Sequence, residues 1–321
     1  MASEYEVRVS KRARPRAKTL GRRAPICAAR TDGRTDENQR PPTHCAQMHQ
    51  AQLDAIEEET KRQPPIGPLQ TLADVRTVIS RELLPAFDAV IARGYRGVRA
   101  IRGDGNCFFR ALMFCLCRQA AENPALRLAL LERMRGSLDY LEKSRYTRVS
   151  IEWFHEVVVE HFEDETMTPA KVEALFADPT ESQNLVWYAR LLCAGYLKQN
   201  ADRFMPFIAD GFADIDSFCA QEVEPVGREA EQVHSIALCE FLTVEIAIEY
   251  VTIGAGVMNA PTLFEPSAQP VLTRVTMLCT LVFCARDACW LTCVGRLLHR
   301  SRGPLRRVAV TFCCLRRRPR V

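Results

Sequence analysis

The chain has 321 residues and a mass of 36.3 kDa, and its 47% hydrophobic and 26% charged residues are typical of a soluble globular protein with one large or two small domains. Its formal net charge of +4 is unevenly distributed, since residues 1–30 carry +7, residues 274–321 carry +10 and the body between them carries −13. An acidic body repels nucleic acid and suits a basic protein partner, although surface charge can also serve solubility alone. We therefore expect no nucleic-acid partner.

Residues 1–49 are predicted to be a disordered basic extension. The segment from Ser10 to Arg23 is basic and nearly free of large apolar residues, so it cannot bury enough surface to offset its ordering entropy. Such a cluster is either a solvated tail or a nuclear-import signal. No apolar run of a secretory signal follows it, and Glu4 and Glu6 disfavour a transit peptide. We expect a cytoplasmic protein, with the nucleus as the alternative location.

The main domain is expected to begin near residue 50. Residues 51–61 are rich in helix-forming residues and are followed by Pro64 and Pro65, which predicts a short, mostly polar helix. Residues 72–95 then repeat apolar side chains at helical spacing, with an interruption at Pro85. This apolar stripe is predicted to belong to the core.

The stretch of residues 102–112 carries the clearest chemical signal. The β-prone residues 98–101 precede it and a helical apolar face follows it, which predicts a strand, a tight turn through Gly105 and a helix that begins at Cys107. The N–H groups and partial positive charge of a helix N-terminus stabilise a thiolate and can receive an oxyanion. Cys107 is therefore either a nucleophile or a buried structural cysteine. Asp104 and Asn106 offer short polar side chains for turn or capping hydrogen bonds.

The rest of the body is mostly helical. Apolar spacing and break signals predict helices over residues 124–145, 149–165, 170–176, 185–197 and around 234–238. His155 and His161 lie beside acidic residues and are interpreted as surface histidines. Residues 245–251 alternate between polar and apolar, which predicts a strand, and a further strand is expected to start at 271–273. Many helices around a small sheet make an α/β fold.

Three separated motifs in this chain resemble those of one family. Residues 104–111 read DGNCFFRA, residues 185–197 contain Tyr-x-Arg-Leu-Leu, and residues 218–238 contain Phe-Cys-x-x-Glu-Val-Glu-Pro and then His-x-Ile-Ala-Leu. In this order they are similar to the otubains, ovarian-tumour-type cysteine proteases that cleave ubiquitin from proteins. The resemblance covers roughly residues 50–273, and it implies the ovarian-tumour protease fold, a small central sheet flanked by many helices.

The resemblance also implies roles for individual residues. Cys107 would be the nucleophile and Asp104 would belong to the catalytic set, while the backbone amides around Gly105 and Asn106 would receive the oxyanion. Glu229 and His234 match family positions near the active centre and are not expected to catalyse. The implied partners are ubiquitin or polyubiquitin and ubiquitin-conjugating enzymes, and neither a metal nor an organic cofactor is implied.

The catalytic histidine of the family is not found in this sequence. Otubains carry it near the end of the domain in a Gly-His-Tyr-Asp segment, and no such segment follows residue 273 here. The single later histidine is His299, which is flanked by arginines about 26 residues past the expected strand and has no carboxylate two positions on. A thiolate nucleophile needs a nearby imidazole, and we do not expect His299 to supply it.

Residues 274–321 look foreign to the domain. They hold six of the fourteen cysteines and eleven arginines, but the cysteine gaps do not fit a zinc site. The apolar run 275–285 is too short to cross a membrane, so no membrane partner is expected, and disulfides do not suit a chain without an export signal. We expect the reading frame to leave the family's sequence after Thr273 or Arg274, and we expect the loss of the last strand to expose a sheet edge and lower stability.

Two functions remain open from the sequence. The first is a ubiquitin-specific cysteine isopeptidase that acts through Cys107. The second is a module of the same fold that binds ubiquitin or a conjugating enzyme without cleaving, because the family's catalytic histidine segment is missing.

Overall fold

The computed structural model describes residues 58, 60–79, 81–95, 97–208, 211–252, 260–281, 298–299 and 308–312, with 252, 280–281 and the last two ranges described by their backbone. All of these residues belong to one compact unit, which begins at His49. The predicted disordered extension and residues 51–57 of the predicted helix lie outside the described residues. The end of that helix is observed, because helical backbone continues to Arg62.

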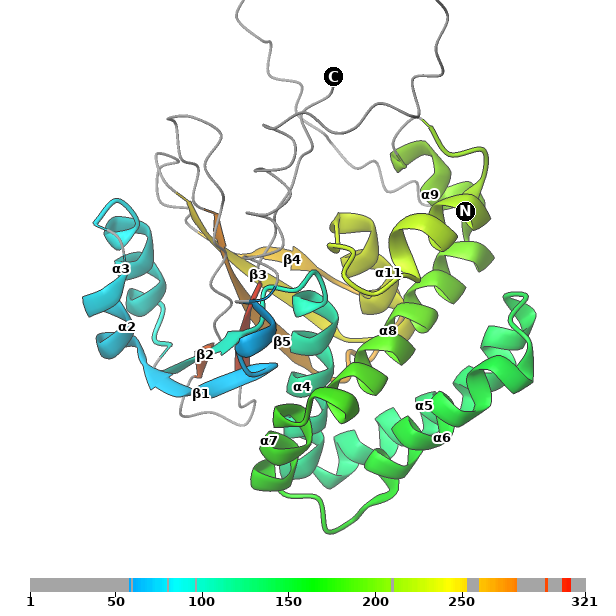
Figure 1. Ribbon diagram of the computed structural model, residues 1–321, viewed down its shortest axis with the longest axis horizontal. Helices are drawn as coiled ribbons and strands as arrows, with labels where there is room; N and C mark the ends of the chain where they lie inside the picture. The colour runs from blue at the N-terminus through cyan, green and yellow to red at the C-terminus, as the bar shows by residue number, and fades with distance from the viewer. Residues whose placement is uncertain are drawn as a thin grey trace, which may run out of the picture. The chain divides into compact units, whose positions relative to one another are not determined.

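Among the described residues, one sheet of seven strands forms in the order β1-β2-β6-β7-β5-β3-β4 (Figure 1). The strands are β1 (Ile66–Thr71), β2 (Gly97–Ile101), β3 (Glu245–Thr252), β4 (Thr262–Phe264), β5 (Arg274–Leu281), β6 (Leu298–His299) and β7 (Val308–Phe312). Strand β5 runs parallel to both β3 and β7, whereas the other pairs are antiparallel. The sheet is therefore mixed, as suits an α/β fold.

Helices account for most of the described chain. They are α2 (Leu72–Val78), α3 (Leu84–Ala92), α4 (Cys107–Glu122), α5 (Pro124–Lys143), α6 (Arg148–Glu163), α7 (Pro169–Ala177), α8 (Pro179–Gln199), α9 (Ala201–Phe204), α10 (Ile215–Phe218) and α11 (Gln232–Leu242), with short turns η2 (Met205–Phe207) and η3 (Cys219–Val223). Three of them start at a proline whose preceding side chain accepts N–H bonds of the first turn: Asn123, Thr168 and Asp178. Proline at the first helical position loses no intrahelical bond, so these starts are locally encoded.

The sheet separates two apolar cores. On one face α2 and α3 pack over Val98, Val251 and Leu278. On the other face the larger core surrounds α4 and α8 and includes Val275 and Met277 of β5. In Figure 1 the pair α2 and α3 accordingly lies to one side of the strands, and α4 to α8 and α11 lie to the other. Side chains that alternate along β5 thus serve both cores, which fixes its register.

Several local expectations were wrong. Residues 66–71, which contain Gly67 and Pro68, form β1, a strand that was not predicted from the sequence. The helical stripe 72–95 breaks at residues 79–83, and Pro85 lies in the first turn of α3, where proline is tolerated. Helix α4 was expected to bury one face, yet it is enclosed nearly all round because α5, α7, α8 and the sheet surround it.

The predicted domain boundary at residues 273/274 falls at the first residue of β5. This strand is buried at Val275, Met277, Leu278 and Cys279, and it pairs with β3 over its whole length from Arg274 to Leu281. The expected new strand thus begins at Arg274 rather than at Val271. Residues of the predicted foreign segment also form β6 and β7, and the described backbone of β7 flanks β5.

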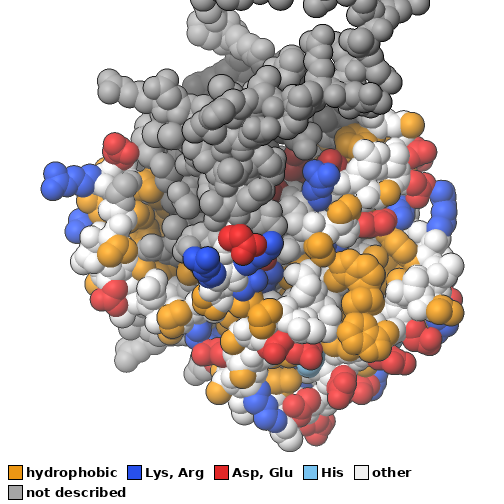
Figure 2. All heavy atoms as spheres, in the orientation of Figure 1, with side chains coloured by type: hydrophobic (Ala, Val, Ile, Leu, Met, Phe, Trp, Pro, Cys, Tyr) orange, Lys and Arg blue, Asp and Glu red, His pale blue; other side chains and the backbone are white. Residues whose placement is uncertain are grey.

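Acidic side chains gather on one part of the surface. Figure 2 shows them along the lower edge of the molecule, where Figure 1 places α6 and its connection to α7. Helix α6 carries Glu152, Glu156 and Glu160 at four-residue spacing, so they share one helix face. The negative charge calculated for residues 31–273 is therefore concentrated in part on α6.

Within the described residues no helix combines the length and the apolar character that crossing a membrane would require.

Candidate active site

Cys107 is the first residue of α4, as predicted, and a five-residue turn joins it to the end of β2 at Ile101. Its side chain is 2% exposed. A thiol in this position lies in the field of the helix N-terminus, which favours the thiolate.

The carboxylate of Asp104 stabilises the turn by accepting hydrogen bonds. Its Oδ1 accepts the N–H of Asn106 at 3.0 Å, and both carboxylate oxygens accept from the guanidinium of Arg110 at 2.8 and 2.7 Å. Arg110 is buried and also donates through Nε to Ser182 Oγ at 3.1 Å. These contacts give Asp104 a positioning role, because they tie the turn to α4 and α8. Its implied membership of the catalytic set stays a prediction.

Gly105 is where the turn meets a second loop. Its φ of +75° lies in the left-handed region, and a Cβ added there would lie 2.1 Å from the carbonyl oxygen of Gly227. Gly227 also has a positive φ, +81°. Because no side chain fits between the two backbones, both the conformation and the close approach require glycine at position 105.

Arg190 of α8 connects these two loops through hydrogen bonds. Its Nη2 donates to the carbonyl oxygens of Gly105 at 2.9 Å and Arg228 at 2.6 Å, and its Nη1 donates to Val223 at 2.9 Å. The Asn106 Oδ1 accepts from Arg190 Nε and Nη2 at 3.2 and 2.8 Å. Burial lowers the pKa of Arg190 to about 10, so it remains charged at neutral pH.

The two other family-matched residues lie on the partner loop and the helix after it. Glu229 directly follows Arg228, whose carbonyl is bound by Arg190, so it is carried close to the turn. His234 is buried, and its Nδ1 accepts the N–H of Glu231 at 2.9 Å as part of the capping box of α11. The ring proton of neutral His234 therefore lies on Nε2, which is buried. In this arrangement His234 is not a base for Cys107.

Burial of His234, with a smaller contribution from the charge of Arg190, lowers its pKa from 6.5 to about 4. Between these two values the unfolded chain binds a proton that the folded chain does not, so stability falls as the pH drops through this window. The difference corresponds to about 3 kcal/mol. Urea unfolding between pH 7 and 4.5 should therefore show a steeper loss in the wild type than in His234→Gln. Equal slopes in the two proteins would contradict this prediction. Burial also lowers the pKa of His161, so a residual slope remains in both the wild type and His234→Gln.

The exclusion of His299 as the base stays a prediction, because the structure describes only its backbone. Its backbone in β6 pairs with Gly97, the first residue of β2, whereas the turn to Cys107 leaves from Ile101 at the other end. These ends are about 13 Å apart along the strand. His155 bonds to the Met134 carbonyl oxygen at 3.0 Å, in the α5–α6 region. Within the described residues, His155 and His234 make their hydrogen bonds to Met134 and Glu231 rather than to the turn of residues 104–107.

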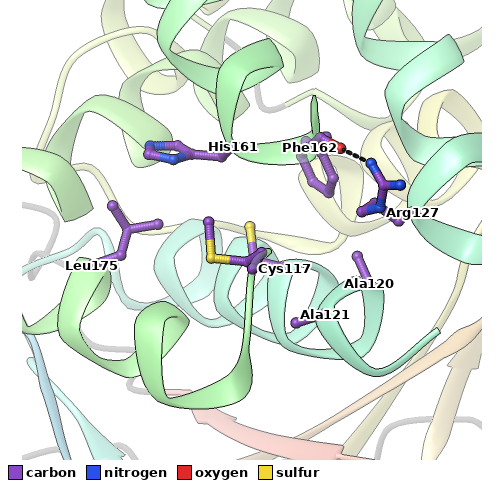
Figure 3. A pocket seen from close by; sticks show the side chains of 8 residues that line it. Cys117, Ala120, Ala121, Arg127, His161, Phe162 and Leu175 are labelled. Carbon is purple, nitrogen blue, oxygen red and sulfur yellow. Dashed lines mark hydrogen bonds between the residues drawn. The ribbon is translucent and has the colours of Figure 1, made fainter. Parts of the chain in front are cut away.

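A small cavity of about 10 Å³, enough for one water molecule, lies at the other end of α4. Figure 3 shows His161 and Cys117 on opposite sides of it, with Arg127 bound to the Phe162 carbonyl. His161 was interpreted as a surface residue, which was wrong: its side chain is 18% exposed, because α6 packs against α4 and α8 there. Cys117 lies about 15 Å along the helix from Cys107, so this cavity is separate from the candidate active site.

Sequence reasoning missed Arg190 and Gly227 as site residues. Arg190 stands in a stretch where nearly every neighbour on α8 is buried, and a cation at such a position needs dedicated partners. The signal in the sequence was an arginine among apolar helix positions, because charged residues are rarely fully buried unless they are paired. No local pattern links it to Asn106, which is 84 positions away.

The family model of peptidase C65, otubain, matches residues 59–279 of the chain. The chain belongs to the otubain family. Human "Ubiquitin thioesterase OTUB1" is 34% identical over 179 residues, which are 55% of this otubain and 65% of the human protein. The Arabidopsis thaliana "OVARIAN TUMOR DOMAIN-containing deubiquitinating enzyme 1" is 31% identical over 208 residues, 60% and 67% of the two chains.

This otubain thus spans about two thirds of the length of the curated relatives it matches. Solved structures of similar fold include an h/ceOTUB1 complex with ubiquitin aldehyde and UBC13~Ub, with a TM-score of 0.62, 22% identity, and coverage of 74% of this chain and 94% of the other. A ceOTUB1 complex with the same named components has a TM-score of 0.63, 23% identity, and coverage of 72% and 94%. The expected ovarian-tumour protease fold is confirmed, and so is the resemblance on which it was based.

Proposed function

We propose that this otubain removes ubiquitin from conjugates or polyubiquitin chains as a cysteine isopeptidase, with Cys107 as its nucleophile. The observation that carries the proposal is the position of Cys107 at the start of α4, behind a turn that Asp104, Gly105 and Asn106 hold in one shape. The names of the relatives, ubiquitin thioesterases and a deubiquitinating enzyme, support the same chemistry.

The reaction would begin with attack of the Cys107 thiolate on the carbonyl carbon of the ubiquitin C-terminal glycine. A C–S bond forms while the carbonyl electrons move to oxygen, and backbone N–H groups at the start of α4 stabilise that oxyanion. Collapse breaks the C–N bond, and the amine takes a proton from water as it leaves. Water then cleaves the thioester, which releases the ubiquitin carboxylate and restores the thiol.

The proposed partners are ubiquitin or polyubiquitin and ubiquitin-conjugating enzymes. The neighbouring structures of the same fold are complexes with ubiquitin aldehyde and conjugating enzymes, which supports both partners. The acidic face of α6 supports a basic protein partner, since opposite charge steers association. We place this activity in the cytoplasm, with the nucleus as the alternative.

A second function, binding without cleavage, is favoured by one specific observation. Of the histidines whose side chains the structure describes, His234 directs its acceptor nitrogen to the Glu231 N–H, while His155 and His161 lie away from the turn. A cysteine protease that lacks its base loses several orders of magnitude in rate, because the members of such a unit act together. Ubiquitin binding would survive that loss.

The purified 321-residue chain should react with ubiquitin that carries a C-terminal thiol-reactive group, and Cys107→Ala should abolish this labelling. Cleavage of di-ubiquitin then separates the two functions. Labelling with Cys107-dependent cleavage supports the isopeptidase, and His299→Ala would then be tested as the source of the base. Labelling without cleavage supports the binding function. Failure to label or to bind ubiquitin at all would contradict both.

A further inference from the structure

The guanidinium of Arg190 occupies the centre of the candidate site's supporting structure. It is 0% exposed, and its hydrogen-bond partners all belong to residues 105–106 and 223–228. Its Cζ lies 4.2 Å from the ring centroid of Phe109 on α4. One side chain of α8 thus connects the nucleophile turn, the partner loop and the first turn of α4.

The effect on Asn106 is chemically specific. Asn106 occupies the N-cap position of α4, where an asparagine side chain usually accepts an N–H of the first turn. Here it makes no such bond, because its Oδ1 accepts from Arg190 Nε and Nη2 and from the Gly227 N–H at 2.9 Å. Three donors draw this oxygen away from the helix. The Asn106 side chain therefore does not compete with an oxyanion for the N–H groups at the start of α4.

The charge of Arg190 acts on the same site. The groups whose charge interacts with Arg190 are, in order of size, Cys193, Asp104, Cys107 and Arg110. Cys107 and Arg190 are both buried, where the attraction between opposite charges is weakly screened. A fixed cation at this place stabilises a thiolate more than a neutral thiol. Burial keeps His234 neutral, so its ring does not supply this charge.

We infer that Arg190 is a positioning residue of this otubain, which withdraws the Asn106 side chain from the α4 N-terminus and supplies the cation that stabilises the Cys107 thiolate. The inference rests on the proposed function because it takes Cys107 as the nucleophile. It adds a residue on α8 that controls whether that nucleophile is ionised and whether its oxyanion site is open.

The reactivity of Cys107 can be measured without ubiquitin. The full chain is alkylated with iodoacetamide across pH 5.5–9.5, and modification is quantified on the tryptic peptide 103–110, which lies between Arg102 and Arg110 and contains Cys107 alone. We expect Arg190→Met to raise the midpoint of this profile by about one pH unit or more. Arg190→Lys keeps the charge but not the planar fork, so its midpoint should lie between those of the wild type and Arg190→Met.

Arg127→Met is the matched control. Arg127 is also a buried arginine of a long helix that donates to backbone carbonyls, those of Phe162 and Glu163, but it lies by the small cavity rather than the turn. The Arg127→Met variant should leave the pH profile of Cys107 alkylation unchanged, even where it lowers the melting temperature. A shift in Arg127→Met equal to that in Arg190→Met would show a general loss of packing and would overturn the inference. So would a profile in Arg190→Met that matches the wild type.

Asn106→Ala covers the case in which Arg190→Met does not fold. In Asn106→Ala, Arg190 keeps its three carbonyl partners and its charge. We therefore expect the midpoint of the alkylation profile to lie within about 0.3 pH units of the wild type. Labelling by reactive ubiquitin should still slow, because the turn loses the bonds from Arg190 and Gly227. A large midpoint shift in Asn106→Ala would refute the assignment of the charge effect to Arg190. An Arg190-dependent profile in a chain that never cleaves ubiquitin would sustain this inference while the proposed function fails.

Discussion

Replacing Gly105 with alanine is expected to destroy the active-site turn, with a loss of about 3 kcal/mol or more in the free energy of unfolding. The new Cβ would lie 2.1 Å from the Gly227 oxygen, 2.4 Å from its carbonyl carbon and 2.9 Å from its Cα. These are backbone atoms, so the whole partner loop would have to move. That movement would break the bonds from Arg190 and from Gly227 to Asn106, and alanine would in addition be strained at a φ of +75°.

Thermal melting tests the stability part of this prediction, and a fall of about 6–12 °C is expected. Gly136→Ala is the matched control, because a Cβ at this exposed position of α5 meets nothing within 4 Å. Inside a helix alanine should stabilise by about 0.5–1 kcal/mol. Labelling of Cys107 by reactive ubiquitin should be lost in Gly105→Ala and normal in Gly136→Ala. A Gly105→Ala protein that melts and labels like the wild type would disprove the interlocked loops.

Locally encoded features of this fold could be predicted from the sequence. The helices that start at Pro124 and Pro169 follow from capping residues directly before proline, and the start of α4 at Cys107 follows from the strand, glycine turn and apolar spacing around it. The start of α8 at Pro179 was missed, because Asp178 and Pro179 were interpreted as a break and the helix was expected only from residue 185. Each of these signals lies within a few residues of the boundary that it sets. The motif around Cys107 could therefore be placed on a helix N-terminus without knowledge of the tertiary structure.

Features that depend on distant partners could not be predicted in the same way. Strand β1 contains Gly67 and Pro68 and has no alternation, and it exists because β2 supplies its hydrogen bonds. His161 is partly buried because neighbouring helices cover most of its side chain, although its flanking acids suggested a surface residue. The bonds from Arg190 to Asn106 join α8 to a turn 84 positions earlier. In all three cases tertiary contacts overrode the local pattern.

The supporting structure of the nucleophile is thus independent of the absent Gly-His-Tyr-Asp segment. Cys107, the turn and the partner loop are held by α4, α8 and residues 223–228, all of which precede residue 273. The apolar side chains of β5 up to Cys279 complete the core on which α4 rests. A chain of this kind can present an aligned thiol even where proton transfer is slow, which is why labelling and cleavage need to be measured separately.

Breaking the pair of Asp104 and Arg110 is the second change with a large expected effect. Asp104→Ala would leave the Arg110 guanidinium, whose side chain is 2% exposed, with Ser182 Oγ and the distant Arg102 carbonyl as its hydrogen-bond acceptors. Removing one partner of a buried ion pair costs about 3–5 kcal/mol, because the remaining charge stays desolvated. The double variant Asp104→Ala/Arg110→Met should recover about half of this loss. Urea unfolding of the two single variants and the double variant measures the coupling.

The same cycle decides how Asp104 acts. If it only positions the turn, the double variant should recover Cys107 labelling together with stability, since the methionine fills the space without a stranded charge. If Asp104 touches the substrate, stability returns and turnover does not.

Arg76 and Asp88 form the control pair: they meet in the same two-bond geometry at 2.6 and 2.9 Å, but they are exposed on α2 and α3. Asp88→Ala should leave the melting temperature nearly unchanged, because solvent screens an exposed pair. A comparable loss from Asp88→Ala would mean that burial of Arg110 is not what makes the Asp104 pair costly to break.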